Sequence, residues 1–362
     1  MQMAPSTIPA TADAIDSDWL TEALTPRYPG VRVRAVCVTA RQEWTNAHAW
    51  LRVDYDEAAG APPVLFCKLL PADARRSAIA ATGMGLREAL FYERLAPSLA
   101  LRVPVAHAVR SDPGDGAFVM LLEDLLASGC TVSDGPSGID PRAATRALED
   151  LAALHVRFED PARRAREAHW VPRPPASDNG YGAAMLHHGL THHRERLSDR
   201  FADLAELYIE QRSALHALWC AGPGPDTVIH GDAHIGNLFD DHGRTGFLDW
   251  GMMQVGKGLR DVSYFLTMSL TPTDRRAHER KLLQHYLAAR EACGGEPVDF
   301  DAAWQAHRLY ASYTVIACCQ VVTFPDNATA KRRIFAESLL ARAEAAIKDL
   351  AVREALHEFA GL

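Results

Sequence analysis

The alternation of hydrophobic and polar positions divides the chain into a strand-rich part and a helical part. A first helix is expected from Ser17 or Asp18, and another over residues 86–95. Strands are expected around residues 31–37, 49–55, 64–70, 103–109 and 117–122. Three strands, a helix and two further strands in close succession predict a small α+β lobe.

Beyond residue 126 the pattern is mostly helical. Asp140 and Pro141 are typical N-cap and first residues for a helix that reaches His155. Further helices are expected at residues 196–219, 258–270, 274–292, 300–323 and 328–358. A short β interruption at residues 227–248, with a turn at 240–243, breaks this helical part. Polar and acidic residues in a turn of this kind are typical of functional sites.

The change of pattern predicts three parts in the 362 residues. Residues 1–29 form an N-terminal extension with a helix. Residues 30–122 form the strand-rich lobe, and residues 123–362 form a helical lobe that carries the β interruption.

Composition excludes several classes of protein. The fractions of hydrophobic (48%) and charged (23%) residues are ordinary for a globular protein, and the net charge of −8 does not predict binding to nucleic acid or to an anionic membrane. We expect neither a membrane span nor a secretory signal, because no apolar run reaches about 18 residues. The seven cysteines form no CxxC pair, which indicates thiols in a reducing cytoplasm. The sequence does not indicate an oligomeric state.

Lys68 is conspicuous because the chain has 38 basic residues but only five lysines, and Lys68 is the first of them. It stands in the apolar strand expected at 64–70. Burying an ammonium group costs several kcal/mol unless it is paired, so Lys68 should have an anionic partner. The alternative is an edge-strand lysine whose ammonium group lies in solvent.

The β interruption contains a cluster of oxygen ligands. The motif His-Gly-Asp-Ala-His-Ile-Gly-Asn occupies residues 230–237, and Phe-Leu-Asp-Trp occupies residues 247–250. Asp232 and Asn237 are five positions apart, and Asp249 follows twelve positions after Asn237. Two carboxylates and an amide oxygen suit Mg²⁺ that is held together with phosphate groups.

These motifs resemble the aminoglycoside phosphotransferase and choline-kinase-like family, which phosphorylates small molecules. The resemblance extends from about residue 30 to about residue 350. It implies a bilobal protein-kinase-like α+β fold, with a small antiparallel-sheet N-lobe that has one main helix and a larger, mostly helical C-lobe. It also implies ATP or GTP as phosphoryl donor, Mg²⁺, and a small hydroxylated acceptor.

The resemblance implies a role for each residue of the motifs. Asp232 would accept or orient the proton of the acceptor hydroxyl, and Asn237 and Asp249 would hold Mg²⁺. Lys68 would bind the nucleotide phosphates, and Glu88 would hold Lys68 in place. His230 and Asp261 would brace the catalytic loop by hydrogen bonds. Residues 120–125, with Leu122 among them, resemble the hinge whose backbone meets the purine.

One segment departs from the protein-kinase pattern. The turn between the first two strands has no glycine from Ala40 to Ala49, so Thr45 and Asn46 are expected to hydrogen bond to the nucleotide instead. Trp250 replaces the phenylalanine of the kinase Asp-Phe-Gly motif, and the chain has no recognisable activation segment. These differences favour a small-molecule acceptor over a protein.

Other features have more than one interpretation. Four histidines, His187, His188, His192 and His193, are interpreted as an exposed or acceptor-facing patch, with a zinc site as the alternative. His155 is expected to be a hydrogen-bonded interior histidine. Trp304, Tyr310 and Tyr313 indicate core packing, with a substrate wall as the alternative.

Two classes of function remain. A third, a zinc-dependent hydrolase built on the histidine patch, is much less favoured. The first is a small-molecule kinase, and the second is a catalytically weak or inactive kinase-fold protein that binds nucleotide or serves as a scaffold. The joint presence of Lys68, Glu88, Asp232, Asn237 and Asp249 favours the kinase. Residues 310–324 contain no acid, which favours a non-polycationic acceptor over an aminoglycoside.

Overall fold

The structure is a computed structural model that describes residues 8–43 and 45–362. Contacts divide the chain into two units: the first runs to Val132 and includes Gly246–Met252, and the second comprises Ser133–Thr245 and Met253–Leu362. This division differs from the expected boundary after residue 122. Glu123 holds the Arg102 guanidinium through both carboxylate oxygens, each at 2.9 Å, and so ties the chain beyond residue 122 to the first unit.

The first unit is built on a five-stranded antiparallel sheet of order β1-β2-β3-β5-β4. Its strands are β1 (Arg32–Glu43), β2 (Ala47–Glu57), β3 (Val64–Leu69), β4 (Ala106–Asp112) and β5 (Ala117–Glu123). The other elements of this unit are α1 (Ser17–Leu24), α2 (Arg76–Ala81), α3 (Met84–Leu90) and β6 (Thr131–Val132). All five strands expected from the alternation are present.

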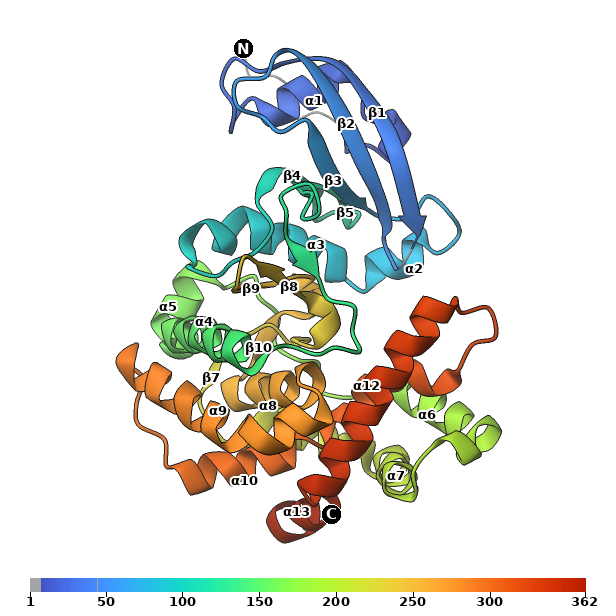
Figure 1. Ribbon diagram of the computed structural model, residues 1–362, viewed down its shortest axis with the longest axis vertical. Helices are drawn as coiled ribbons and strands as arrows, with labels where there is room; N and C mark the ends of the chain where they lie inside the picture. Colours follow the sequence, from blue (N-terminus) through green and yellow to red (C-terminus); the bar gives the residue numbers. More distant parts are fainter. Residues whose placement is uncertain (1–7, 44) are drawn as a thin grey trace. The chain divides into compact units, whose positions relative to one another are not determined.

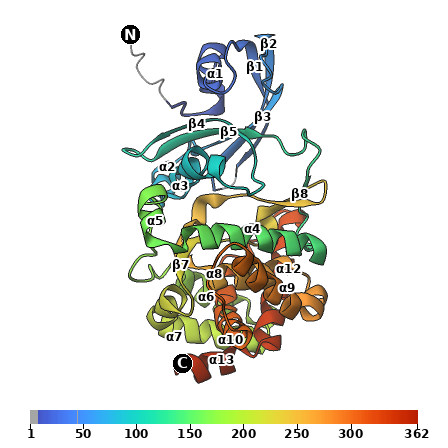
Figure 2. The ribbon, with the colours of Figure 1, turned by 90° about the vertical axis from the view of Figure 1, so that its left-hand side faces the viewer.

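Helices α1 and α3 lie on opposite sides of this sheet (Figure 2). Leu20 and Leu24 of α1 are fully buried in one core with Leu51 of β2, Leu65 of β3 and Leu121 of β5. Successive side chains along each strand point to opposite faces of the sheet. The described part of the N-terminal extension expected at residues 1–29 therefore belongs to the first unit, because its helix covers one face of the sheet. Strand residues that alternate with the core residues under α1, Lys68 among them, point to the face that α3 covers.

Helix α3 approaches the sheet closely because its second residue has no side chain. A Cβ atom at Gly85 would lie 2.0 Å from the ring of Phe118 in β5. The helix continues into a π-helical turn, Phe91–Leu95. This packing fixes Glu88, one turn further along α3, on the Lys68 side of the sheet.

The second unit consists mainly of helices (Figure 1). They are α4 (Pro141–Glu159), α5 (Pro161–Glu167), α6 (Tyr181–His192), α7 (Asp199–Ala221), α8 (Gly258–Ser269), α9 (Pro272–Ala292), α10 (Phe300–Tyr310), α11 (Tyr313–Ala317), α12 (Ala330–Asp349) and α13 (Val352–Ala360). The β interruption contains β7 (Asp226–Ile229), β8 (Leu238–Asp241), β9 (Arg244–Phe247) and β10 (Gln254–Lys257), and β7 pairs with β10. The predicted α+β class, with an antiparallel sheet followed by a helical part, is confirmed.

Helix α8 is the centre of the second unit. Every one of its residues is buried, and it packs against α4, α9, α10 and α12. A helix that is buried all round is surrounded by other elements and held in a fixed position. The residues that α8 contributes to the candidate site are therefore rigidly placed.

Several helix predictions differ from the structure. The helix expected at 300–323 is broken into α10, α11 and a 3-10 turn, and the one expected at 328–358 breaks at Ala351, which has a positive φ of 47°. Helices α5 and α6 were not predicted. Helix α5 is only seven residues long, too short for a clear helical repeat of apolar positions. Helix α6 begins after Gly180, which has a left-handed conformation, rather than after a polar N-cap residue.

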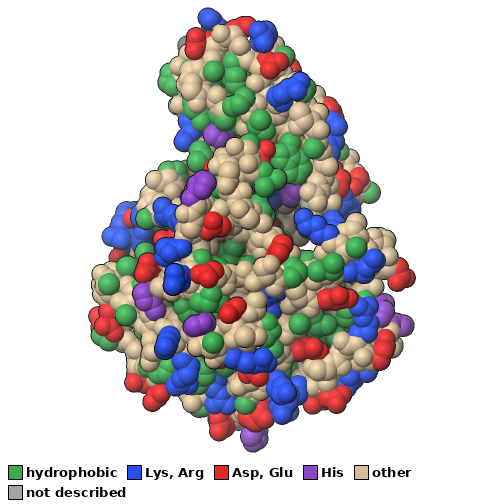
Figure 3. All heavy atoms as spheres, viewed as in Figure 1, with side chains coloured by type: hydrophobic (Ala, Val, Ile, Leu, Met, Phe, Trp, Pro, Cys, Tyr) green, Lys and Arg blue, Asp and Glu red, His purple; other side chains and the backbone are tan. Residues whose placement is uncertain are grey.

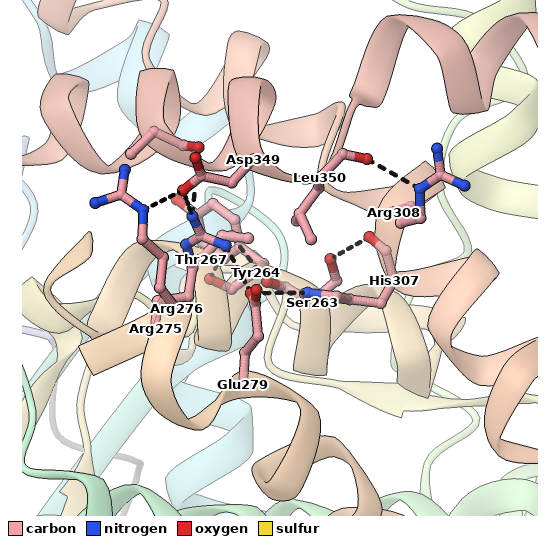
Figure 4. Close-up of polar contacts among 11 residues, drawn as sticks. Ser263, Tyr264, Thr267, Arg275, Arg276, Glu279, His307, Arg308, Asp349 and Leu350 are labelled. Carbon is pink, nitrogen blue, oxygen red and sulfur yellow. Dashed lines mark hydrogen bonds and ion pairs between the residues drawn. The ribbon is translucent and has the colours of Figure 1, made fainter. Parts of the chain in front are cut away.

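A buried ionic cluster links α9, α10 and α12 (Figure 4). The Arg275 guanidinium donates to Glu279 at 2.6 Å and also to Asp349, while His307 lies 3.5 Å from Glu279. Burial alone would raise the pKa of Glu279, but the hydrogen bonds and charges of His307 and Arg275 outweigh it and lower that pKa. The cluster thus stabilises the packing of these helices while Glu279 is ionised.

We expect Glu279→Gln to lower the free energy of unfolding by about 1–3 kcal/mol, because a buried donor loses its charged acceptor. Urea unfolding of both proteins measures the difference. The difference should be full at neutral pH and shrink as the pH falls through the lowered pKa of Glu279, since wild type then loses the same charge. Equal stability at pH 7 would contradict this expectation.

Acidic and basic side chains are interspersed over the face of the second unit that Figure 3 shows. This mixture agrees with the moderate net charge of −8. Among the described residues, no helix is both long and apolar enough to cross a membrane.

Candidate active site

In the first unit, Lys68 of β3 and Glu88 of α3 form a buried ion pair. The Lys68 Nζ lies 2.6 Å from Glu88 Oε2, and the two side chains are 7% and 3% exposed. The expected pairing of these residues is therefore present. Burial raises the pKa of Glu88 to about 7, against the opposing effect of the Lys68 charge. Burial would lower the pKa of Lys68, but the carboxylates of Asp249 and Glu88 outweigh it and raise that pKa, so Lys68 stays charged.

Asp249 joins this pair within the first unit. Its Oδ1 lies 3.5 Å from Lys68 Nζ, and its side chain is 49% exposed. Its φ of 54° lies in the left-handed region, which costs about 1–3 kcal/mol for a residue other than glycine and is concentrated at functional sites. The strained backbone thus holds one carboxylate partly exposed beside a buried ammonium group.

The segment around Asp249 is fastened to α3 and the turn that follows it. The Trp250 ring stacks on Phe91 at 4.0 Å between centroids, and Arg87 donates to the Gly251 carbonyl at 2.6 Å. These contacts hold the two residues that follow the strained position. They account for how the conformation of Asp249 is maintained.

Of the other predicted nucleotide residues, Leu122 lies on the face of the sheet that carries Lys68, because it pairs with Phe66, two positions before Lys68. Leu122 is buried near the end of β5. Thr45 and Asn46 lie in the turn between β1 and β2, where Thr45 is exposed and Asn46 is buried. His48 of β2 lies directly opposite Lys68. Burial, with a smaller effect of the Lys68 charge, lowers the pKa of His48 to about 4, so its imidazole is neutral near pH 7.

In the second unit, the Asp232 carboxylate is oriented by two donors. Tyr264 of α8 donates its hydroxyl to Asp232 Oδ1 at 3.1 Å, and Asn237 Nδ2 donates to Asp232 Oδ2 at 3.1 Å. Burial, with a smaller effect of the Asp232 charge, raises the pKa of Tyr264 well above its usual value, so the hydroxyl remains a donor. The Asp232 side chain is 33% exposed, which leaves part of the carboxylate accessible.

The backbone of the loop is held from beneath by Asp261. Its carboxylate accepts the amides of His230 and Gly231, both at 2.9 Å, as the bracing role expected for it requires. His155 is fully buried and hydrogen bonded to Tyr286 at 2.8 Å, and it lies 3.4 Å from Asp261. Burial would raise the pKa of Asp261, but His155 and the loop donors lower it, so the carboxylate stays ionised. The loop therefore rests on a charged, buried acceptor.

Aromatic rings cluster around Tyr264, which donates to Asp232. The His234 ring lies 6.2 Å from the Tyr264 ring and 6.3 Å from the Phe335 ring, and Tyr264 packs edge-on against Tyr313 at 5.5 Å. His234, Phe335 and Tyr313 are half-buried. Tyr310 is buried in the core, as expected, whereas Tyr313 belongs to this ring cluster.

The residues expected to bind metal have suitable chemistry. Asn237 uses its amide nitrogen in bonds to Asp232, so its amide oxygen, the atom that a hard cation binds, points the other way. Asp249 offers a partly exposed carboxylate. The oxygen donors that each unit supplies therefore fit Mg²⁺.

The histidine patch lies on and just after α6 rather than in a loop. The His188 ring lies 4.6 Å from that of His192 and 5.8 Å from that of His193. Residues 8–43 and 45–362 contain no group of three or more His, Cys, Asp or Glu side chains arranged to hold a metal ion.

Two site residues were not identified from the sequence. Tyr264 follows Asp261 by three positions, so both lie on one face of a helix, and that spacing was the available signal. His48 can be identified only from the register between β2 and β3, because the local sequence pattern does not determine which residue pairs with Lys68.

Comparison with known proteins identifies relatives of this chain. Residues 68–306, more than half of the chain, match the Phosphotransferase enzyme family. No curated protein sequence matches the chain.

Solved structures share the fold at low sequence identity. The GDP complex of wild-type aminoglycoside 2'-phosphotransferase-IIIa is 14% identical, with 92% of this chain and 100% of that chain covered and a TM-score of 0.51. The GDP and kanamycin complex of APH(2")-IIia is 13% identical, with 91% and 99% covered and a TM-score of 0.51. A choline/ethanolamine kinase family protein from Mesorhizobium loti is 19% identical, with 94% and 99% covered and a TM-score of 0.49. By the extent of its match to the family, this chain belongs to the Phosphotransferase enzyme family.

Proposed function

We propose that the chain is a Mg²⁺-dependent enzyme that transfers the terminal phosphoryl group of ATP or GTP to a hydroxyl group of a small molecule. The observation that carries the proposal is the Asp232 carboxylate. Two donors orient it, a buried carboxylate braces its loop, and one third of the side chain is exposed. A general base must be held in this way to meet the proton of an acceptor hydroxyl.

The other residues act on the nucleotide. Lys68 binds phosphate oxygens, and Glu88 keeps the ammonium group in position. Asn237 and Asp249 hold Mg²⁺, which neutralises charge on the phosphates when bound. Thr45, Asn46 and Leu122 contribute to nucleotide binding around these groups. Asp232 positions the hydroxyl and receives its proton as the bond to phosphorus forms.

The alternative is a kinase-fold protein that binds nucleotide without transferring phosphate. Such a scaffold has no use for an oriented base or for metal ligands. The hydrogen bonds that Tyr264 and Asn237 make to Asp232 favour the enzyme.

A transfer assay separates these two functions. Purified protein is incubated with Mg²⁺, terminally labelled ATP or GTP, and pools of small alcohols and antibiotics, and label in a product is measured. Asp232→Asn protein and reactions without acceptor are the controls. Transfer that depends on Asp232 supports the enzyme, whereas nucleotide binding with no transfer across broad pools supports the scaffold.

We infer an acceptor that is hydroxylated and not a polycation. Residues 310–324 contain no acid, and Tyr313 and Ile316 of α11 are half-buried. The Asp178 carboxylate is close enough to this segment for its charge to affect Cys319. However, this carboxylate already accepts a hydrogen bond from the Tyr208 hydroxyl. An ammonium group left unpaired against apolar walls loses several kcal/mol of solvation. These surroundings favour a neutral or partly apolar alcohol.

Kanamycin therefore tests the acceptor class, because a relative with this fold is solved in complex with it. We expect kcat/KM for kanamycin- and gentamicin-type substrates to stay below about 10⁴ M⁻¹s⁻¹, the lower end of ordinary enzyme efficiency. Steady-state kinetics with both donors measure it. A higher value would show that an aminoglycoside is the acceptor.

We also propose a cytoplasmic location. The seven cysteines, all within the described residues, form no disulfide bonds, at exposed positions such as Cys293 and at buried ones such as Cys318. Cysteines that remain reduced in both settings are typical of a reducing compartment.

A further inference from the structure

We propose that His48 is a phosphate-binding residue of this protein, and that its imidazole Nε2–H donates a hydrogen bond to a phosphoryl oxygen of the donor nucleotide. The inference rests on the proposed function, because that function places nucleotide phosphates at Lys68. It adds a side chain from β2 to the residues that bind them.

The register of the sheet places His48 beside Lys68. The two residues are direct partners across β2 and β3, so their side chains lie on the same face of the sheet with Cβ atoms about 4.5–5.5 Å apart. The His48 ring packs against Phe66, the residue two positions before Lys68, at 5.2 Å between centroids. The imidazole is thus held on the Lys68 side of the sheet, next to the residue that the proposed function assigns to the phosphates.

The Nε2 atom of His48 is buried and has no hydrogen-bond partner among residues 8–43 and 45–362. Leaving a buried polar atom unpaired is unfavourable, so such atoms in native proteins call for an explanation. The His48 residue as a whole is half-buried. Because no described protein group holds Nε2, a ligand meets no competitor for it.

A second unpaired atom lies just before the same strand. Asn46 Oδ1, in the bend that precedes β2, is also buried without a partner among the described residues. Two polar atoms at this end of β2 are therefore unsatisfied in the protein alone, and His48 Nε2 is the one that can donate to a phosphate oxygen.

The sequence of the turn explains why a side chain is needed. In kinases with a glycine-rich loop, backbone amides approach the phosphates closely. Residues 40–49 contain no glycine, so this turn lacks the residue that most readily lets a backbone approach a ligand closely, and a donor on a side chain compensates for it. The neutral Nε2–H of His48 is such a donor.

The experiment compares two variants that separate the ring from the donor. His48→Phe keeps a ring against Phe66 but has no N–H group, and His48→Gln keeps an N–H donor without the ring. His107→Leu is the matched control, because His107 lies in β4 of the same unit and hydrogen bonds to Tyr28. Calorimetry measures the binding of ATP and GTP with Mg²⁺ and, for the tighter of the two, of its nucleoside. Thermal unfolding verifies that each variant is folded.

We expect His48→Phe to weaken binding of the nucleotide about tenfold, which corresponds to 1.4 kcal/mol, and to leave binding of the nucleoside unchanged. His48→Gln should bind the nucleotide within about threefold of wild type, as expected for a restored hydrogen bond, and His107→Leu should match wild type. If His48→Phe does not fold, His48→Leu replaces it. Histidine ¹⁵N spectra of wild type give a measurement without variants, since the His48 Nε2 resonance should shift with nucleotide and not with nucleoside.

The outcomes distinguish this inference from the proposed function. Unchanged nucleotide affinity in folded His48→Phe, or an equal loss for nucleotide and nucleoside, would overturn the role of His48 while leaving the function in place. Failure of wild type to bind either nucleotide would overturn both.

Discussion

Replacement of Asp232 by Asn is expected to lower turnover by about 10²- to 10⁴-fold, the usual contribution of a positioned acid or base. The change removes the charge that receives the proton but keeps the shape of the side chain. This loss corresponds to about 3–5 kcal/mol of activation free energy. Single-turnover and steady-state assays with the acceptor identified by the transfer screen measure it.

The expected loss is confined to the chemical step. The loop remains anchored because Asp261 accepts backbone amides of residues that precede Asp232. Nucleotide affinity should therefore stay within about threefold of wild type, a change smaller than one ordinary hydrogen bond represents. Asp199→Asn is a matched control, since this carboxylate is 89% exposed and pairs with Arg194 on the surface. Turnover within threefold of wild type in Asp232→Asn would rule out the assignment of Asp232 as the base.

The positions of the strands along the chain and the central helices could be predicted because their signals are local. Alternation along β2 and β3 reports directly which residues are buried, and Leu51 and Leu65 are in the core as the pattern requires. The pairing of Lys68 was also predictable, because a lone lysine in an apolar strand needs an anion wherever that strand lies.

Other parts of the fold depend on contacts that the sequence does not display. The break after α11 ends in Phe324, which has a φ of 39° and carries the Arg196 guanidinium over its ring at 3.6 Å. Residues 312–324 are mostly weak helix formers such as Thr, Val and Cys, but no Gly or Pro marks where the helix ends, so tertiary contacts decide the position of the break. The same holds for the π-helical turn after α3, where Phe91 stacks on Trp250 from a distant part of the chain.

The candidate site shows the same division between local and distant signals. Asp232, Asn237 and Asp249 stand in motifs whose spacing is visible in the sequence. Tyr264 and His48 act through neighbours that are 32 and 20 positions away. Their place in the site depends on helix packing and strand register, which is why the sequence alone did not identify them.

Asp249 is the second residue for which a large effect is expected, because it offers a carboxylate close to the ammonium group of Lys68. Asp249→Ala should abolish the part of nucleotide affinity that depends on Mg²⁺, since the variant has no oxygen donor at this position. Calorimetry with Mg²⁺ and with a chelator separates that part. Lys68→Ala provides the comparison, because it should weaken nucleotide binding with or without the metal.

The backbone of Asp249 decides which variant is the sharper test. Its φ of 54° is unfavourable for alanine by roughly 1–2 kcal/mol, whereas asparagine tolerates this conformation. Asp249→Asn therefore keeps the local fold and one neutral oxygen while it removes the charge that attracts a divalent cation. If Asp249→Asn loses most of the Mg²⁺ dependence and remains as stable as wild type, the charge is what holds the metal. If both variants bind Mg²⁺-nucleotide as tightly as wild type, the metal is held by other residues, and the strained position of Asp249 requires another explanation.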